Sequence, residues 1–205
     1  MRASRWRSGA CLSALTLALC ACVSVFPRAT PVQLYRFGYG DGPVSVATVA
    51  AEPVMGVSQT AFDPGAATDR ILTVSGQSAA YIHGARWIAP APVLFDEALA
   101  RAFQAPGAPV MARRGDTVVA RYSLALDVQT FEARYDQGPE APPEVIVQIR
   151  AVLIRNDTRQ PVAERTLSSV QRASDNRIGP IVQAYDRATR DGLVQLVAWT
   201  GGEVR

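Results

Sequence analysis

Several residue types that support enzyme chemistry are missing or scarce in this sequence. It contains no lysine, one histidine (His83), and three cysteines, the last of which is Cys22. A Walker phosphate loop requires a lysine, and a zinc site needs several nitrogen or sulfur ligands. No G-x-S-x-G nucleophile motif occurs, and His83 falls in a predicted strand. We therefore predict a protein that is not an enzyme and that holds no metal or cofactor.

The mature part of the sequence also lacks an excess of either charge. The formal net charge of +3 equals the contribution of three arginines near the N-terminus, Arg2, Arg5 and Arg7, where no acidic residue occurs. A domain that is otherwise close to neutral has no electrostatic basis for binding nucleic acid. Because 48% of the residues are hydrophobic, a packed core is expected.

The first residues have the three parts of a secretory signal. Residues 1–9 carry the positive charges, and residues 10–21 form an apolar run that is shorter than the roughly 20 residues a bilayer span requires. The run ends in Leu19-Cys20-Ala21-Cys22, which resembles a lipobox. We predict cleavage between Ala21 and Cys22 and lipid attachment at Cys22, with acyl chains such as palmitate as the membrane anchor. The alternative is an ordinary or uncleaved signal segment with an incidental cysteine.

These features predict a signal peptide over residues 1–21, a tether over 22–31, and one domain over 32–205. Its first half suggests a strand over 33–37, one or two strands within 44–62, a hairpin of 70–74 and 79–83, and a helix over 92–104. The hairpin is predicted because Gly76-Gln77 suits a two-residue turn. The helix is predicted because apolar residues recur on one face.

The second half predicts three antiparallel strands and a final helix. In residues 117–135 the alternation of apolar and polar residues changes phase, which predicts a β-bulge near Gln129-Thr130. Strands over 145–155 and 161–171 complete the meander, and a helix runs from Pro180 to about Trp199. Strands and helices in this order predict one α/β domain.

A family resemblance lies in the middle of the chain. It rests on Asp69-Arg70-Ile71-Leu72, Tyr81, Gly84-Ala85-Arg86-Trp87 and Pro90-Ala91-Pro92. With the lipobox and the final helix, this pattern resembles the ABC-type transport auxiliary lipoproteins, also called PqiC-like lipoproteins. Many members have an acidic residue soon after the tryptophan, whereas Ile88-Ala89-Pro90 stands here.

The resemblance implies a fold, partners and a location. The implied fold is a three-layer α/β domain, similar to the anticodon-binding-like group, with a mixed, largely antiparallel sheet and helices packed on it. The implied function is that of an accessory to an ABC transporter with an MCE-domain protein, which moves lipids or other hydrophobic compounds across the cell envelope. The implied partners are the MCE protein and its permease and ATPase, and a homo-oligomer stays open. The residue after Cys22 is Val23. An aspartate at this position would favour retention in the inner membrane, so its absence favours the outer membrane, with the domain facing the periplasm.

Two readings remain open for the motif and for the function. The motif has two possible roles, contact with a partner or support of the fold, and its residues are Tyr81, Arg86, Trp87, Pro90 and Pro92. The fold role is favoured, with Trp87 as a core residue and Arg86 stacked on it or paired with a carboxylate. The alternative function is an outer-membrane lipoprotein that binds and activates a cell-wall synthase, because one fold can serve several roles.

Overall fold

The computed structural model describes residues 31–39, 55–112 and 120–204. The predicted signal peptide, Cys22 and nearly all of the tether lie outside these residues, as does the first part of the predicted 44–62 strand region. The elements are β1 (Gln33–Tyr35), β2 (Met55–Phe62), β3 (Arg70–Ser75), β4 (Ser78–Trp87), α1 (Ala91–Ala102), β5 (Met111–Ala112), β6 (Tyr122–Arg134), β7 (Glu144–Arg155), β8 (Gln160–Arg172) and α2 (Ile178–Glu203).

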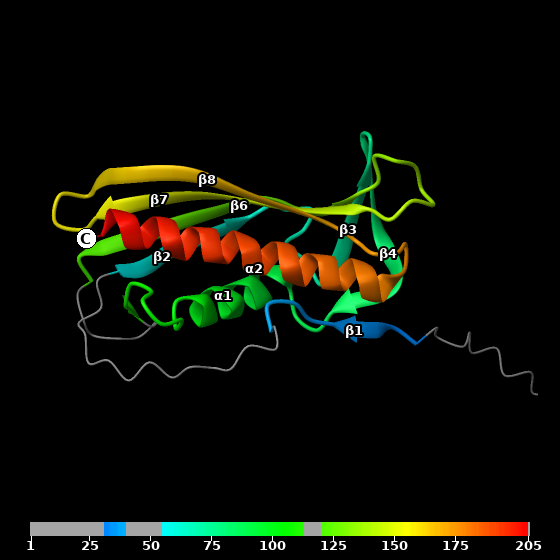
Figure 1. Cartoon of the computed structure of the whole chain (residues 1–205), viewed down its shortest axis with the longest axis horizontal. Helices are drawn as coiled ribbons and strands as arrows, with labels where there is room; N and C mark the ends of the chain where they lie inside the picture. The colour runs from blue at the N-terminus through cyan, green and yellow to red at the C-terminus, as the bar shows by residue number, and fades with distance from the viewer. Residues whose placement is uncertain (1–30, 40–54, 113–119, 205) are drawn as a thin grey trace, which may run out of the picture. The chain divides into compact units, whose positions relative to one another are not determined.

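The strands form one mixed sheet that is organised around β6 (Figure 1). Strand β7 pairs antiparallel with one edge of β6, and β8 pairs antiparallel with β7. Along the other edge of β6, β2 pairs in parallel with the first half, and β3 pairs in parallel near the end. The β2–β3 connection, residues 63–69, therefore lies beside the middle of β6. Strand β4 pairs antiparallel with β3, and its end pairs in parallel with β1.

The predicted meander and its bulge are confirmed. Val128 pairs with Ile149 and Thr130 pairs with Gln148, so Gln129 is the extra residue. An extra residue reverses the alternation of side chains, which explains why Val128 and Phe131 are both buried although they lie three positions apart.

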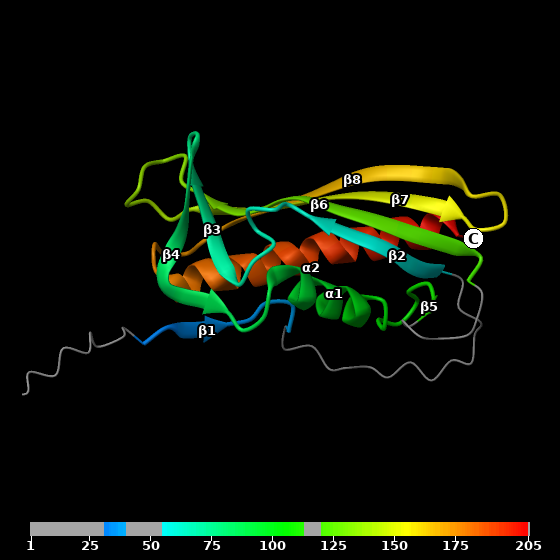
Figure 2. The same cartoon turned by 180° about the vertical axis from the view of Figure 1, so that it is seen from behind.

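The predicted hairpin is also confirmed, with Gly76-Gln77 as its turn and a φ of 57° at Gly76. Strand β4 is longer than the predicted 79–83 segment because its last residues pair with β1. Strand β1 is shorter than predicted and stops at Tyr35. Figure 2 shows the tip of the hairpin projecting from the rest of the sheet.

Both helices occur where the sequence indicates them, with different bounds. Helix α1 begins at Ala91, after Pro90 at the N-cap, and ends two residues before the predicted end. Helix α2 continues to Glu203, through Gly201-Gly202, so the predicted end near Trp199 is wrong. Glycine lowers helix propensity by only about 1 kcal/mol, and tertiary packing readily overrides that cost. A Cβ at Gly201 would lie within 3.8 Å of Pro109, so the helix end packs closely on the domain.

The two helices pack on one face of the sheet. Helix α2 contacts β7 and β8, and α1 contacts α2 and β2. On β7 every second residue is buried, whereas the alternate residues are partly exposed. The mixed α/β single domain is thus confirmed. In the described residues it has two layers where the resemblance implied three, because the apolar stripes of both helices are buried in the same core.

Candidate functional site

The motif residues surround the β2–β3 loop, Asp63–Asp69. Nη1 of Arg86 donates to both carboxylate oxygens of Asp69, at 3.0 and 2.8 Å. The backbone N–H of Trp87 donates to the carbonyl oxygen of Asp69 at 2.7 Å. The side chains of Arg86 and Asp69 are each 41% exposed, so solvent screens the ion pair and it contributes at most about 1 kcal/mol. The structure thus pairs Arg86 with a carboxylate.

Tyr81 and the start of α1 hold the rest of the same loop. The Tyr81 hydroxyl donates to the carbonyl oxygen of Gly65 at 3.0 Å, and the Arg70 guanidinium lies 5.0 Å from the Tyr81 ring. The backbone N–H of Ala91 donates to the carbonyl oxygen of Thr68 at 3.0 Å. Pro90 is the N-cap of α1 and Pro92 lies in its first turn, where proline is tolerated.

Trp87 lies in the core and is 2% exposed. Its ring packs edge-on against Phe37 and Tyr185, with centroid distances of 5.0 and 5.2 Å. Phe131 contacts the rings of Phe37 and Tyr185 as well. We call these four residues the aromatic cluster. It joins β4, β6, α2 and the segment after β1, so a single packing unit connects the motif to both ends of the domain.

Tyr185 is the one hydroxyl-bearing member of the aromatic cluster. Its hydroxyl is buried and donates to the carbonyl oxygen of Leu72 at 2.7 Å. Burial, which disfavours the charged phenolate, raises the pKa of Tyr185 well above its ordinary value, and the nearby Glu132 adds to the rise. A raised pKa stabilises the folded state below the unfolded value of about 10, and this stabilisation is lost as the pH rises through the folded value.

We expect Tyr185→Phe to lower the free energy of unfolding by about 1–2 kcal/mol, because the buried Leu72 carbonyl loses a donor. Above a pH of about 10 the unfolding free energy of the natural protein falls with pH, and that of the variant falls less steeply. Urea denaturation across this pH range measures both effects. If the unfolding free energies of the two proteins fall equally steeply with pH, Tyr185 does not contribute to alkaline unfolding.

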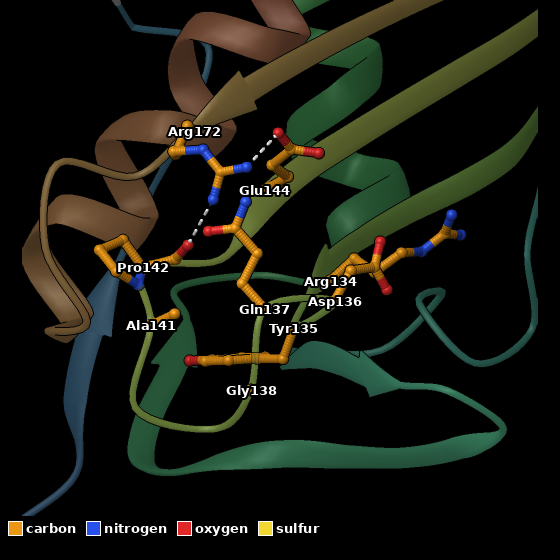
Figure 3. Close-up of a pocket in the computed structure, with 9 residues that line it drawn as sticks. All are labelled: Arg134, Tyr135, Asp136, Gln137, Gly138, Ala141, Pro142, Glu144 and Arg172. Atoms are coloured by element: carbon orange, nitrogen blue, oxygen red, sulfur yellow. Dashed lines mark hydrogen bonds and ion pairs between the residues drawn. The ribbon is translucent and has the colours of Figure 1, made fainter.

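A polar recess of about 240 Å³ lies near the loop between β6 and β7 (Figure 3). Arg172 lines it, with Nη2 donating to Glu144 at 2.5 Å and Nη1 donating to the Pro142 carbonyl at 3.1 Å. Arg134 is paired with Glu132. Ligand pockets are mostly apolar, whereas this recess is lined by polar and charged groups, of which Arg134, Glu144 and Arg172 are already paired within the domain. Its lining is mostly polar, which does not suit an acyl chain.

Within residues 31–39, 55–112 and 120–204, no group of three or more His, Cys, Asp or Glu side chains is placed to hold a metal ion. None of the helices in these residues is long and apolar enough to cross a membrane.

Sequence reasoning did not identify the partners of the motif. Asp69 belongs to the motif and a carboxylate partner for Arg86 is expected, but the sequence does not show that this carboxylate is Asp69, 17 positions away. Phe37 and Tyr185 are likewise typical apolar positions, and only the packing of distant elements brings them to Trp87. The only feature of the sequence that indicates the aromatic cluster is the placement of aromatic residues at positions expected to face the core.

The chain is similar to several solved structures. Protein XCC0632 from Xanthomonas campestris is 24% identical, with a TM-score of 0.68 over 83% of this chain and 96% of that chain. An uncharacterized protein is 14% identical, with a TM-score of 0.61 over 85% and 99% of the two chains. The hypothetical protein CT253 from Chlamydia trachomatis is 11% identical, with a TM-score of 0.50 over 75% and 98%. At these identities the likeness concerns the fold alone.

No curated protein matches the sequence. The model of one protein family does match it, over residues 40–197, which include the β2–β3 loop, Phe131, Tyr185, helix α1 and most of helix α2. This match extends over well more than half of the chain. The chain therefore belongs to the family described as the ABC-type transport auxiliary lipoprotein component.

Proposed function

We propose that this protein is a membrane-anchored periplasmic accessory lipoprotein of an MCE-type ABC transport system, which moves lipids or hydrophobic compounds across the envelope. The family match over residues 40–197 is the observation that carries the proposal. The lipobox supports it by supplying the anchor, with a signal peptide over 1–21, Cys22 as the lipidated residue, and a tether over 22–31 before the domain. Val23 favours the outer membrane as the anchoring membrane.

The protein acts in this proposal by docking and not by catalysis. The motif side chains of Tyr81 and Arg86 are bound to the β2–β3 loop of their own domain. Their arrangement supports a role in holding the loop, and it leaves the exposed backbone of the β3–β4 hairpin as the more suitable contact with a partner.

The outer edge of β4 is the candidate docking surface. Strand β4 pairs with β1 only through Ala85–Trp87, so Ser78–Gly84 has no strand on that side among the described residues. This stretch contains neither a charged residue nor a proline, which protect many exposed edges. Its pairing with β3 is regular from Ser78 to Tyr81 and irregular beyond that, so Ser78 to Tyr81 is the part best suited to receive a strand. An extended segment of the MCE-domain protein is the occupant we propose, paired by β-augmentation.

The outer edge of β8, by contrast, is protected against pairing with another strand. It carries Pro161, Glu164 and Arg165, and side chains of α2 donate to two of its carbonyl groups, from Arg187 to Arg172 and from Gln195 to Ser168. These features are typical of an edge that is protected against pairing. The difference between the two edges favours β4 as the side that receives a partner strand.

Co-purification from the native host tests the function. After crosslinking and mild detergent extraction, we expect an MCE-domain protein with its permease or ATPase to be recovered with the tagged chain. A Cys22→Ala variant should leave the membrane fraction and recover far less of the transporter, which separates specific partners from shared residence. Recovery of a cell-wall synthase in place of the transporter would favour the alternative function.

A charge on the β4 edge tests the docking surface. We expect Ala79→Lys to reduce recovery of the MCE protein roughly tenfold, which corresponds to about 1.4 kcal/mol of binding free energy. Val162→Lys, on the protected β8 edge, is the matched control and should leave recovery unchanged. Circular dichroism establishes that both variants are folded. Equal recovery with both variants would place the docking surface elsewhere.

A further inference from the structure

Four exposed aliphatic residues lie around the start of the domain. Val32, Leu34, Ile88 and Val93 are 47%, 60%, 61% and 48% exposed, and we call them the β1 patch. Val32 precedes β1, Leu34 lies in β1, Ile88 follows β4, and Val93 lies in the first turn of α1. The other exposed aliphatic residues in the described part of the chain, such as Val162, Val170 and Val194, lie on β8 and α2. Single exposed apolar residues are normal in proteins, whereas a gathering of them marks an interaction surface.

Strand pairing directs the β1 patch outward. Tyr35 pairs with Trp87 and Leu34 pairs with Arg86 in the parallel register of β1 and β4. Tyr35 and Trp87 pack into the core, so the alternate side chains of Leu34 and Arg86 face away from it. Ile88 continues that side, and its backbone N–H donates to the Tyr35 carbonyl at 2.8 Å.

Cationic and aromatic groups lie beside the β1 patch. Arg36 follows β1 directly, and its guanidinium lies 4.4 Å from the ring of Tyr39. The Arg101 guanidinium of α1 lies 3.9 Å from the same ring and is already paired with Glu97 and the Gly38 carbonyl. Arg36 is therefore the cation available to a lipid headgroup. Aliphatic side chains with arginine and tyrosine next to them are the combination that suits the headgroup region of a bilayer.

The position of the β1 patch in the chain indicates what occupies it. Val32 is the tenth residue after Cys22. A connection of that length reaches at most about 35 Å when fully extended, so a lipid on Cys22 keeps the patch within reach of the bilayer surface. Figures 1 and 2 place β1 on the side of the domain opposite the tip of the β3–β4 hairpin.

We propose that the β1 patch lies on the phospholipid surface of the leaflet that holds the lipid anchor. This contact orients the domain so that the β3–β4 hairpin is directed away from the membrane. The inference rests on the anchor at Cys22, which is part of the proposed function, and it adds a second, protein-based contact with the lipid.

The cysteine content of the chain makes a direct test practical. Cys11 and Cys20 precede the predicted cleavage site and Cys22 is blocked by lipid, so Ile88→Cys introduces a single reactive thiol. A polarity-sensitive dye on this thiol is compared with the same dye on Val194→Cys. Val194 is equally exposed, at 61%, but lies on α2. Both lipid-anchored proteins are reconstituted into phosphatidylcholine–phosphatidylglycerol vesicles that contain a spin-labelled quencher lipid.

We expect a blue-shifted emission at position 88 and quenching there at least about twofold stronger than at position 194. Equal quenching at the two positions overturns the proposal. The proposal is also overturned if the dye emission at position 88 changes only when the purified MCE protein is added, because the β1 patch then binds a protein and not the membrane.

Failure of the anchor is read separately. The intact mass of the same samples shows whether Cys22 carries acyl chains. If the acyl chains are absent, the proposed function is contradicted. A copy with a histidine tag in place of the lipid, held on nickel-chelating vesicles, repeats the comparison without native acylation. Equal quenching at 88 and 194 on those vesicles again counts against the β1 patch.

Discussion

Replacing Trp87 with alanine is expected to lower the free energy of unfolding by about 3–5 kcal/mol, the usual cost of removing a large buried aromatic side chain. Trp87 is 2% exposed and contacts three other rings of the aromatic cluster, which come from β6, α2 and the segment after β1. These elements are far apart in the sequence, so little local rearrangement can fill the cavity. The loss includes favourable edge-to-face ring contacts beyond the buried area itself.

Urea denaturation followed by circular dichroism measures this effect without depending on the fluorescence of the removed residue. Ile88→Ala is the matched control, because it truncates the next residue in the chain at a position that is 61% exposed. We expect the control to change stability by less than about 0.5 kcal/mol. A loss of less than about 1 kcal/mol in Trp87→Ala would contradict a structural role for this motif residue.

Gly38→Ala is expected to destabilise the protein by about 3 kcal/mol through two separate effects. Gly38 has a φ of 76°, which L-residues with a side chain adopt at a cost of about 1–2 kcal/mol. A Cβ at this position would also lie 2.4 Å from the Cβ of Ala98 in α1, and neither atom belongs to a flexible side chain. The backbone of Gly38 is held in place by Asp186 and Arg101, so it cannot move away without losing hydrogen bonds.

Two further variants distinguish these effects. Gly107 has a φ of 81° but no atom within 4 Å of a built Cβ, so Gly107→Ala measures the backbone cost alone. Gly38→Ala combined with Ala98→Gly removes the close contact and should recover part of the stability, less about 1 kcal/mol for glycine in a helix. Equal losses in Gly38→Ala and Gly107→Ala, measured by urea denaturation, would mean that the contact with α1 is relieved at no cost.

The two proposed contact surfaces lie on different sides of the domain, one for the MCE protein and one for the membrane. The open edge of β4 lies on the projecting hairpin, and the β1 patch begins at Val32, ten residues after Cys22 in the sequence. A domain with the proposed lipid contact on one side and the proposed protein contact on the other is suited to bridging a transporter and a membrane. The Ala79→Lys and Ile88→Cys experiments probe the two sides independently.

Much of the local structure could be predicted from the sequence because it depends on residues close in the chain. The change of phase after Val128 predicts the bulge, Gly76-Gln77 predicts the hairpin turn, and the apolar stripes predict both helices. The bounds were less accurate where tertiary contacts extend an element. Helix α2 passes through Gly201-Gly202, and β4 continues to Trp87 beside β1.

The sequence by itself determined three features: a domain that is close to neutral, few residues suited to catalysis, and a motif that resembles a transport accessory family. It also predicts a lipobox at the N-terminus. Only the tertiary structure decided which residues the motif side chains contact, because Arg86 meets Asp69 and Trp87 meets Tyr185 through the pairing and packing of separate elements. It also decided that β2 and β3 share one edge of β6, and that the outward side of β1 is apolar. Turns and helices follow from nearest neighbours along the chain, whereas strand order and exposed edges follow from contacts between residues that no local pattern connects.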